Sequence, residues 1–257
     1  MNRITDYSEL KKRIVDWIKD YYTNNNLQSL VVGVSGGIDS AVVSTLCAET
    51  GLPTYVVRMP LESAHNNTKL SDLHAQQLAE KYDNVTSVQI ELSSVYDQLL
   101  HNIRWWSEAQ HFDKKEFTSD ELANANTKSR IRMVTLYQIA GAKKGIVVGT
   151  GNKVEDYGIG FYTKYGDGGV DIAPIADLYK TEVRELGGYL GVDALIIDAQ
   201  PTDGLWDDGR SDEDQIGATY EELEEAMENG EGKAVDILYK FNNQNRHKMQ
   251  PIPTFKL

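Results

Sequence analysis

The chain has 257 residues, of which 26 are Lys or Arg and 39 are Asp or Glu, so its formal net charge is −13. An acidic chain without a block of Lys and Arg residues is poorly suited to bind a long nucleic-acid backbone, so we expect no nucleic-acid partner. The single cysteine, Cys47, excludes a disulfide framework and a Cys-x-x-Cys metal or redox site.

The first half of the chain alternates between strand and helix patterns. Asp6 is a candidate cap for a helix whose apolar residues recur on one face, and residues 30–34 predict a strand buried on both faces. A second helix follows directly after this strand. Residues 53–59 and 85–92 predict two further strands, with a helix over 68–82 between them.

The second half is less regular. Residues 101–120 show no clean period, which predicts a surface excursion, whereas 121–144 predict one long helix. A fourth buried strand is expected over 146–148, ending in a glycine turn. The acidic stretch 202–214 reads as a loop, either simply solvated or acting as a mobile lid. Two helices close the chain, over 220–229 and 233–245.

This alternation predicts an α/β fold with a doubly wound parallel sheet and helices on both faces. Such a fold binds its ligands at the carboxyl ends of the strands. We expect one domain over 1–257 with a helical C-terminal extension over about 215–257. The sequence has neither a signal-peptide pattern nor an apolar run of membrane-spanning length, so we expect a cytoplasmic protein without a membrane contact.

The loop after the first strand is the main candidate binding element. Glycines 36 and 37 allow the backbone N–H groups to approach an anion, and Ser35 and Ser40 add hydroxyl donors at a helix N-terminus. We expect this loop to bind a phosphate chain. Asp39 would repel it unless a divalent cation lies between them, which favours bound Mg²⁺. The alternative is a plain glycine turn in which Asp39 is a helix N-terminal acid.

The pattern Ser-Gly-Gly-Ile-Asp-Ser at 35–40 resembles the pyrophosphatase loop of enzymes that split ATP into AMP and pyrophosphate. Longer motifs resemble the ammonia-dependent NAD synthetases. They include Asn-x-x-x-Arg-x-Arg-Met at 126–133 and Phe-Tyr-Thr-Lys-Tyr-Gly-Asp-Gly-Gly at 161–169. The resemblance spans nearly the whole chain and implies the adenine nucleotide alpha hydrolase-like fold.

The resemblance implies a ligase that makes NAD from deamido-NAD, ATP and ammonia. A carboxylate has a poor leaving group, so it must first be adenylated. The carboxylate attacks the α-phosphorus of ATP and pyrophosphate is released, and ammonia then displaces AMP. Mg²⁺ would ease the departure of pyrophosphate, with ATP as co-substrate. A glutamine-dependent enzyme of this class needs an amidase domain with a nucleophilic cysteine, so we expect free ammonia or ammonia from a partner.

The resemblance also assigns residues. Those matching ATP-binding positions are Gly33, Val34, Ser35, Gly36, Gly37, Ile38, Asp39, Ser40, Thr150, Lys180 and Thr202. The metal ligands would be Asp39 and Glu155, with Asp156 as the alternative to Glu155 because one extra residue separates two of the motifs. Positions that contact deamido-NAD fall on Arg130, Lys164, Asp171, His247 and Lys248.

Asp167 and Lys164 are the catalytic candidates. A carboxylate beside the acyl carbon would recruit ammonium and accept its proton, and we assign this role to Asp167 as a hypothesis. The rival interpretation is that Gly-Asp-Gly-Gly at 166–169 forms a plain turn. The resemblance further implies a homodimer with substrate bound across the subunit contact.

Two other functions compete with this one. Another ATP-pyrophosphatase would act on a different substrate such as a tRNA base, which the acidic balance disfavours. A nucleotide sensor without catalysis would bind ATP or NAD but release no pyrophosphate.

Overall fold

A parallel sheet forms the centre of the protein. The computed structural model describes residues 3–61, 65–113, 115–201 and 211–256. Its strands are β1 (Leu30–Gly33), β2 (Thr54–Arg58), β3 (Val85–Gln89) and β4 (Ile146–Val147), paired in parallel in the order β3-β2-β1-β4. The chain moves outward from β1 to β3 and then returns to the other side of β1. This reversal places a ligand-binding crevice at the carboxyl ends of β1 and β4.

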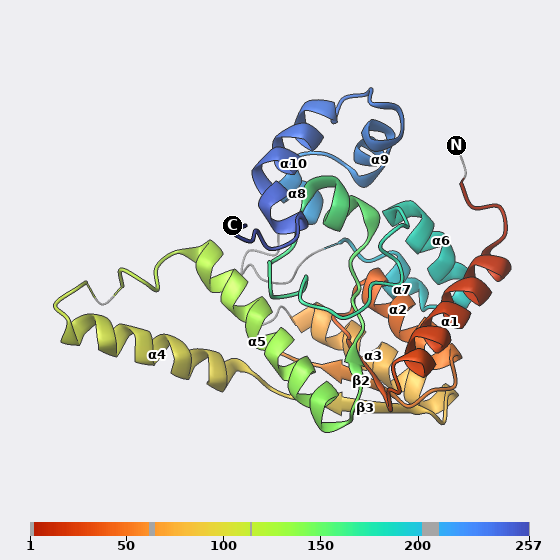
Figure 1. Cartoon of the computed structure of the whole chain (residues 1–257), viewed down its shortest axis with the longest axis horizontal. Coiled ribbons are helices and arrows are strands. Elements are labelled where there is room, and N and C mark those ends of the chain that lie inside the picture. Colours follow the sequence, from red (N-terminus) through yellow and green to blue (C-terminus); the bar gives the residue numbers. More distant parts are fainter. Residues whose placement is uncertain (1–2, 62–64, 114, 202–210, 257) are drawn as a thin grey trace.

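Helices cover both faces of this sheet (Figure 1). One face carries α2 (Ile38–Glu49) and α3 (His65–Lys81), with α1 (Tyr7–Asn24), α6 (Lys180–Leu190) and α7 (Ala194–Ile197) packed around α2. The other face carries α5 (Glu121–Ala142), which contacts β1 and β4.

Alternate residues of the strands enter two separate apolar clusters. Val32 and Val56 pack with α2 and α6, whereas Val31 and Val57 pack with α5. All four side chains are fully buried. The expected doubly wound sheet with strands buried on both faces is therefore confirmed.

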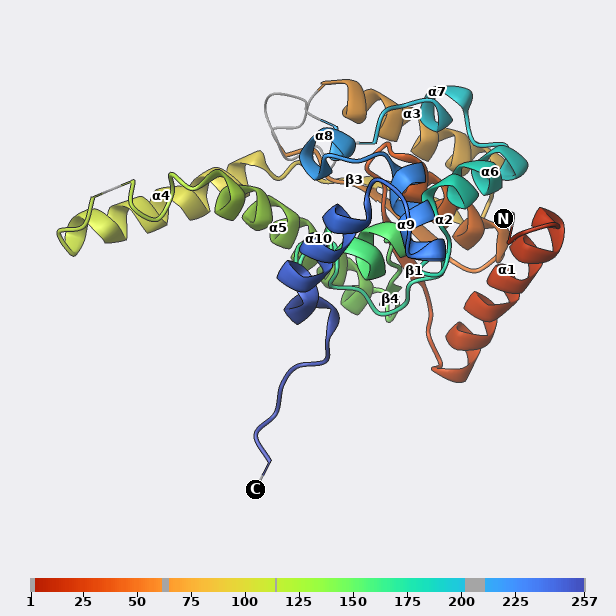
Figure 2. The same ribbon diagram turned by 90° about the horizontal axis from the view of Figure 1, so that it is seen from above.

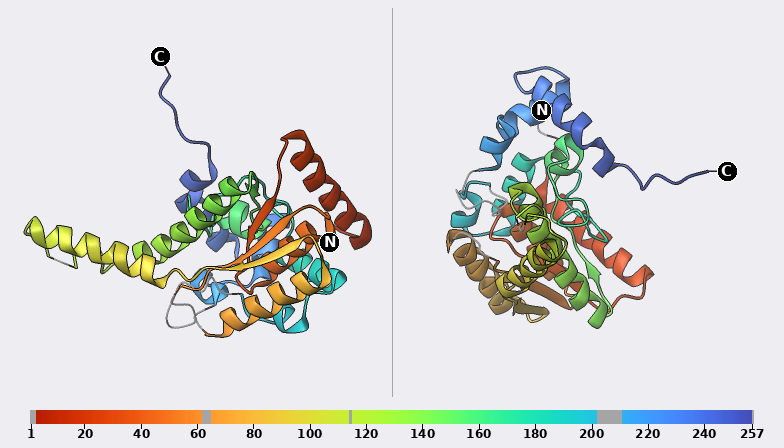
Figure 3. Two further views of the ribbon diagram at one scale, coloured as in Figure 1. Left: turned by 90° about the horizontal axis from the view of Figure 1, so that it is seen from below. Right: turned by 90° about the vertical axis from the view of Figure 1, so that its left-hand side faces the viewer.

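Two outgrowths extend from this core. The first is an arm formed by α4 (Ser93–Ala109) and the start of α5, which projects far to one side (Figures 1 and 2). The second, the C-terminal cap, joins the π-helix η1 (Lys153–Ile159) to the three C-terminal helices around an apolar cluster of its own. These helices are α8 (Asp212–Ile216), α9 (Tyr220–Asn229) and α10 (Val235–Met249). Beyond α10 the chain leads away from the body (Figure 3).

Several local expectations are confirmed and others are wrong. Asp6 caps α1 by accepting hydrogen bonds from the N–H groups of Ser8 (2.9 Å) and Glu9 (3.0 Å). The expected surface excursion at 101–120 does project, but it is helical to Ala109. The helix begins at Ser93, so the window from residue 101 contains only its second half. The prediction of a loop over 202–214 is wrong at its end, because Ser211 caps the helix α8, which begins at Asp212. Residues 202–210 of that loop, including Thr202, lie outside the described residues.

Candidate active site

The predicted phosphate loop lies at the carboxyl end of β1, where it leads into α2. Ser40 Oγ accepts from the N–H of Ser35 (3.2 Å) and donates to the carbonyl of Gly37 (3.0 Å). Gly36 adopts a φ of 93°, which glycine tolerates. The N-cap of α2 is Gly37, which has no side chain to cap the helix, so the first N–H groups of α2 remain suited to an anion.

A cleft of about 690 Å³ opens beside this loop. Its walls come from the loop, the end of β4, the inner part of α5, the segment 160–170 and the last turn of α10. The cleft therefore occupies the crevice that the strand order predicts, and segments distant in sequence meet in it.

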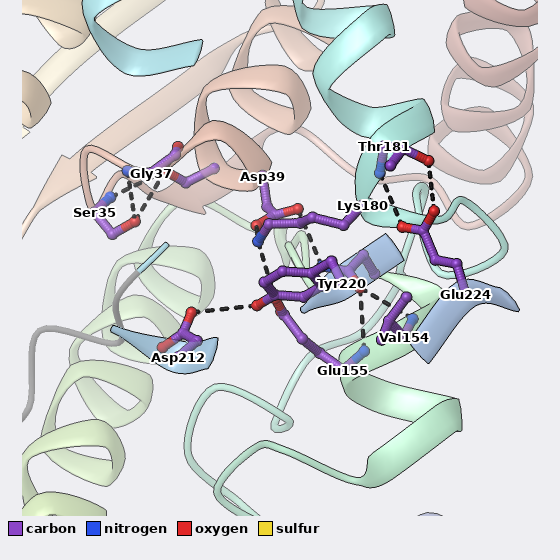
Figure 4. Close-up of polar contacts among 12 residues, drawn as sticks. Ser35, Gly37, Asp39, Val154, Glu155, Lys180, Thr181, Asp212, Tyr220 and Glu224 are labelled. Atoms are coloured by element: carbon purple, nitrogen blue, oxygen red, sulfur yellow. Dashed lines mark hydrogen bonds and ion pairs between the residues drawn. The ribbon is translucent and has the colours of Figure 1, made fainter. Parts of the chain in front are cut away.

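Three buried charged groups meet at one end of the cleft (Figure 4). The ammonium Nζ of Lys180 lies 2.5 Å from Asp39 Oδ2 and 2.9 Å from Glu155 Oε1. Asn152 Nδ2 donates to the other oxygen of Asp39 (3.2 Å), and the hydroxyl of Tyr220 donates to Glu155 Oε1 (2.6 Å). The sequence predicts the first three residues as site residues, and the structure brings them together.

The electrostatics of this group follow from its burial. Burial opposes the charge of Lys180, but the attraction of Asp39 and then of Glu155 outweighs it and raises the pKa of Lys180. Burial, together with repulsion by Glu155, raises the pKa of Asp39 despite the nearby ammonium. For Glu155 burial acts in the same direction, but Lys180 and the Tyr220 hydroxyl outweigh it, so its pKa is lowered.

The donor set fits a magnesium ion that is shared with a phosphate chain. Mg²⁺ is usually held by one or two carboxylates together with phosphate oxygens and water. Asp39 and Glu155 supply two carboxylates around one positive charge, that of Lys180. Within the described part of the chain no three metal-binding side chains gather as a site of their own. While the Lys180 ammonium lies between the two carboxylates, the residues fit a metal completed by ATP rather than one held by protein ligands alone.

Asp156 lines the same cleft, but among the described residues no hydrogen bond or ion pair joins its carboxylate to Lys180. Its carboxylate lies against Gly151, where an added Cβ would come within 2.0 Å of Oδ2. Burial, and then the charges of Glu155, Asp167 and Asp39, raise the pKa of Asp156 to about 8. Of the two alternatives for the second metal ligand, Glu155 is the one that shares a cation with Asp39.

The expected substrate-binding cations gather at the other end of the cleft. Arg130 donates from Nε and Nη2 to the carbonyl of Lys164 (3.3 Å each), and Lys164 Nζ donates to the carbonyl of His247 (3.1 Å). Lys248 Nζ donates to the carbonyl of Tyr162 (2.7 Å). His247 and Lys248 lie in the last turn of α10 and line the cleft.

Asp171 does not join them. Its carboxylate accepts from the N–H of Val147 (2.8 Å) and from the hydroxyl of Tyr137 (3.1 Å), and it is exposed outside the cleft lining. The expected substrate contact of Asp171 is therefore not formed within the cleft of its own chain.

Asp167 lines the cleft and fixes the loop that carries it. Its Oδ1 accepts from Ser129 Oγ (2.8 Å) and from the N–H of Thr163 (2.9 Å), and its own N–H donates to Ser129 (2.9 Å). Burial raises its pKa against these hydrogen bonds. Gly166 packs so closely on Ser129 that a Cβ would come within 2.3 Å of Oγ. Residues 166–169 therefore do form a turn, and the same turn holds the Asp167 carboxylate at the cleft, so the two interpretations of this segment are compatible.

Sequence reasoning missed Asn152, Ser129 and Tyr220. Each acts by orienting a predicted residue, and their local patterns carry no signal for this. Tyr220 occupies the first position of α9, where an aromatic residue indicates only a helix packed on a core.

The family model for NAD synthase matches residues 10–254 of the chain. An NH3-dependent NAD synthetase from Finegoldia magna is 34% identical, over 98% of this chain and 97% of the relative. One from Carboxydothermus hydrogenoformans is 36% identical, over 95% of each chain.

Solved structures agree. The NMN synthetase from Francisella tularensis superposes with a TM-score of 0.86 at 31% identity, over 99% of this chain and all of that one. The NH3-dependent NAD synthetase from Campylobacter jejuni gives a TM-score of 0.75 at 25% identity, over 98% of this chain and all of that one. A matching family model over most of the chain and relatives of equal length lead to one conclusion: the chain belongs to the NAD synthase family.

Proposed function

We propose that the two ends of the cleft hold the two substrates of one ligase reaction. The enzyme adenylates the nicotinate carboxylate of deamido-NAD with ATP and amidates it with ammonia, giving NAD, AMP and pyrophosphate. The observation that carries this assignment is the continuity of the cleft from Lys180, Asp39 and the phosphate loop to Arg130 and Lys248. A triphosphate at one end and an anionic nucleotide at the other would meet at its centre.

At the ATP end, the loop 33–40 and the N-terminus of α2 bind the phosphates through N–H and hydroxyl groups. Lys180 neutralises charge on the departing pyrophosphate. Thr150 also lines the cleft. Asp39 and Glu155 would hold Mg²⁺, which supplies Lewis-acid stabilisation of the phosphate oxygens when bound. Binding of metal and ATP would shift the Lys180 ammonium from between the carboxylates toward the phosphates.

At the substrate end, Arg130, Lys164 and Lys248 suit a pyrophosphate or a carboxylate. These cations donate to backbone carbonyls, and a substrate anion would replace those acceptors. Asp167 would attract ammonium and accept a proton as nitrogen attacks the acyl carbon. Asp167→Asn, made beside Ser129→Ala, tests this role, because a residue that serves only the turn would give the same loss of rate in both variants.

A second candidate differs in the nucleotide that is amidated. The NMN synthetase from Francisella tularensis resembles this chain over its full length, and its name indicates a mononucleotide product. The same chemistry on nicotinate mononucleotide would need only the nicotinate and one phosphate to be recognised. Both candidates use the same ATP end of the cleft.

The assay that separates them supplies Mg-ATP and ammonium with either deamido-NAD or nicotinate mononucleotide, and follows the amide product and pyrophosphate. NAD formation with the larger kcat/KM supports the first candidate, and NMN formation with the larger kcat/KM supports the second. Pyrophosphate release without either amide would contradict both. Replacing ammonium with glutamine tests the nitrogen source, and ammonium alone is the source that we expect to suffice.

We further propose that the chain acts as a homodimer through the arm. Trp106, Phe112 and Phe117 form a cluster there with ring centroids 5.7–5.9 Å apart, and each is close to half exposed. Neighbouring Trp105 is 64% exposed. An exposed aromatic patch of this kind favours a protein contact. Across a dimer, the exposed Asp171 of one copy would be available to the substrate site of the other.

We also propose that the cap and the sheet act as one domain over 1–257, since η1 links the cap to the metal ligands. Within the described residues, no helix has the length and apolar character needed to cross a bilayer. A cytoplasmic location, where ATP and pyridine nucleotides are present, agrees with this function and is part of the proposal.

A further inference from the structure

Tyr220 is the largest fully buried side chain of the described residues. It belongs to α9 in the C-terminal cap, and its hydroxyl reaches the charged end of the cleft (Figure 4). The hydroxyl donates to Glu155 Oε1 at 2.6 Å and also lies 3.3 Å from Asp212 Oδ2. The ring of Tyr220 lies beneath the Lys180 ammonium, 4.9 Å from its centroid.

This contact is more specific than packing requires. A phenylalanine would fill the same apolar cluster, so the hydroxyl is present at the cost of burying a polar group, which must be offset by hydrogen bonding. A carboxylate oxygen can only accept, so in this contact the hydroxyl is the donor. Its hydrogen bond ends on the same oxygen, Oε1, that accepts from Lys180.

Glu155 lies in the first turn of the π-helix η1, where the Asn152 side chain caps the backbone. Elements of this kind are rare but are frequent at functional sites. Among the described residues, the Lys180 ammonium (2.9 Å) and the Tyr220 hydroxyl (2.6 Å) make the close contacts to the Glu155 carboxylate, and the Asn152 side chain adds a weaker hydrogen bond. If Lys180 turned toward ATP phosphates, the Tyr220 hydroxyl would be the closest contact left to orient Glu155, with the Asn152 side chain as a weaker one.

We propose that Tyr220 is a positioning residue that orients Glu155 for Mg²⁺ and thereby couples the C-terminal cap to the ATP end of the cleft. This inference rests on the proposed function, in which Glu155 is a metal ligand. Removing a group that orients a metal ligand usually weakens metal affinity by about 10- to 100-fold.

The test is a titration of Mn²⁺ as a spectroscopic substitute for Mg²⁺. Bound and free Mn²⁺ are measured by electron paramagnetic resonance on the full chain in excess over ATP, without the second substrate, and a titration of ATP alone is subtracted because ATP itself binds Mn²⁺. Tyr220→Phe keeps the ring and removes the hydroxyl. The matched control is Tyr82→Phe, because the Tyr82 hydroxyl donates to Glu49 at 2.7 Å, a bond of the same type remote from the cleft.

For Tyr220→Phe we expect the Kd for Mn²⁺ to rise by about tenfold while the Kd for ATP measured in EDTA stays within about twofold. We also expect the Mg²⁺ concentration for half-maximal activity to rise, with kcat recovered at high Mg²⁺. Tyr82→Phe should leave the Mn²⁺ constant unchanged. A Tyr220→Phe variant that binds Mn²⁺ like the parent, with or without a lower Tm, would overturn the inference.

The proposed function fails in a different way. If the parent chain shows no ATP-dependent Mn²⁺ binding at all, then Glu155 is no metal ligand and both proposals fall together. If Tyr220→Phe does not fold, the same titration on Tyr220→Met decides, because this change also removes the hydroxyl that donates to Glu155. An unchanged Mn²⁺ constant in that variant would also overturn the inference.

Discussion

Replacing Lys180 by methionine should destabilise the protein strongly unless a metal ion is supplied. Lys180 is only 3% exposed, and its two carboxylate partners are 16% exposed each. Methionine fills a similar volume but leaves Asp39 and Glu155 as two buried negative charges without a cation. The loss therefore comes from uncompensated charge rather than from a cavity.

Breaking a buried ion pair on one side costs about 3–5 kcal/mol. Here the lower end applies, about 3 kcal/mol, because both carboxylates keep some contact with water and Asp39 can take up a proton. For a chain of this size that loss lowers Tm by about 6–12 °C. The assay is thermal unfolding followed by circular dichroism at pH 7.5, with and without 10 mM MgCl₂, a concentration of about that order being enough to occupy a weak Mg²⁺ site.

The double variant Lys180→Met/Asp39→Asn is the internal control. It removes one of the two stranded charges, and the remaining one on Glu155 still accepts the Tyr220 hydrogen bond. The double variant should therefore be more stable than Lys180→Met alone, and added Mg²⁺ should raise the Tm of the single variant more than that of the parent. A loss below about 1 kcal/mol, or a double variant no more stable than the single one, would refute the reasoning.

Three further predictions follow from other contacts. Burial lowers the pKa of His74 from 6.5 to about 4, so the unfolded chain binds a proton between these pH values that the folded chain does not, and about 3 kcal/mol of stability is lost as pH falls through this window. Urea unfolding should show less of this loss in His74→Gln than in the parent or in the exposed control His101→Gln, and an equal loss would contradict the assignment. Glu155→Gln should weaken Mg²⁺ activation by about tenfold or more, whereas Asp156→Asn should leave it within a few-fold; the reverse order in a Mg²⁺ titration of pyrophosphate release would make Asp156 the ligand. Trp105→Ser should raise the dissociation constant of the homodimer by about tenfold or more in analytical ultracentrifugation, and an unchanged constant would move the contact away from the arm.

The sheet could be predicted from the sequence because its signals are local. Buried parallel strands are short apolar runs, and the glycine-rich loop after residues 30–33 identifies β1 and its ligand-binding end. The boundaries of α9 at Tyr220 and Asn229 match the prediction, because Thr219 caps the helix and Gly230 follows it. In contrast, α4 is missed because its helical repeat, with Tyr96, Leu100 and Ile103 on one face, begins before residue 101, where the predicted irregular stretch starts.

The site was predictable only in part, because motifs name residues but not their partners. The resemblance identifies Asp39, Glu155 and Lys180, but not that Lys180 lies between the two carboxylates, a contact across 141 residues of sequence for Asp39. Tyr220 carries no motif and acts through a tertiary contact. For Asp171 the motif is present, but the predicted contact is not. Its carboxylate accepts a hydrogen bond from Val147 of β4 and does not line the cleft of its own chain.

The central claim is that the substrate carboxylate is adenylated within this cleft before ammonia attacks. The most direct test uses deamido-NAD or nicotinate mononucleotide carrying ¹⁸O in the nicotinate carboxylate, with Mg-ATP and ammonium, and mass spectrometry of the AMP formed. Adenylation predicts that one carboxylate oxygen moves to AMP, so each AMP carries one ¹⁸O and the amide retains the other. AMP without the label, formed together with the amide, would contradict the acyl-adenylate mechanism.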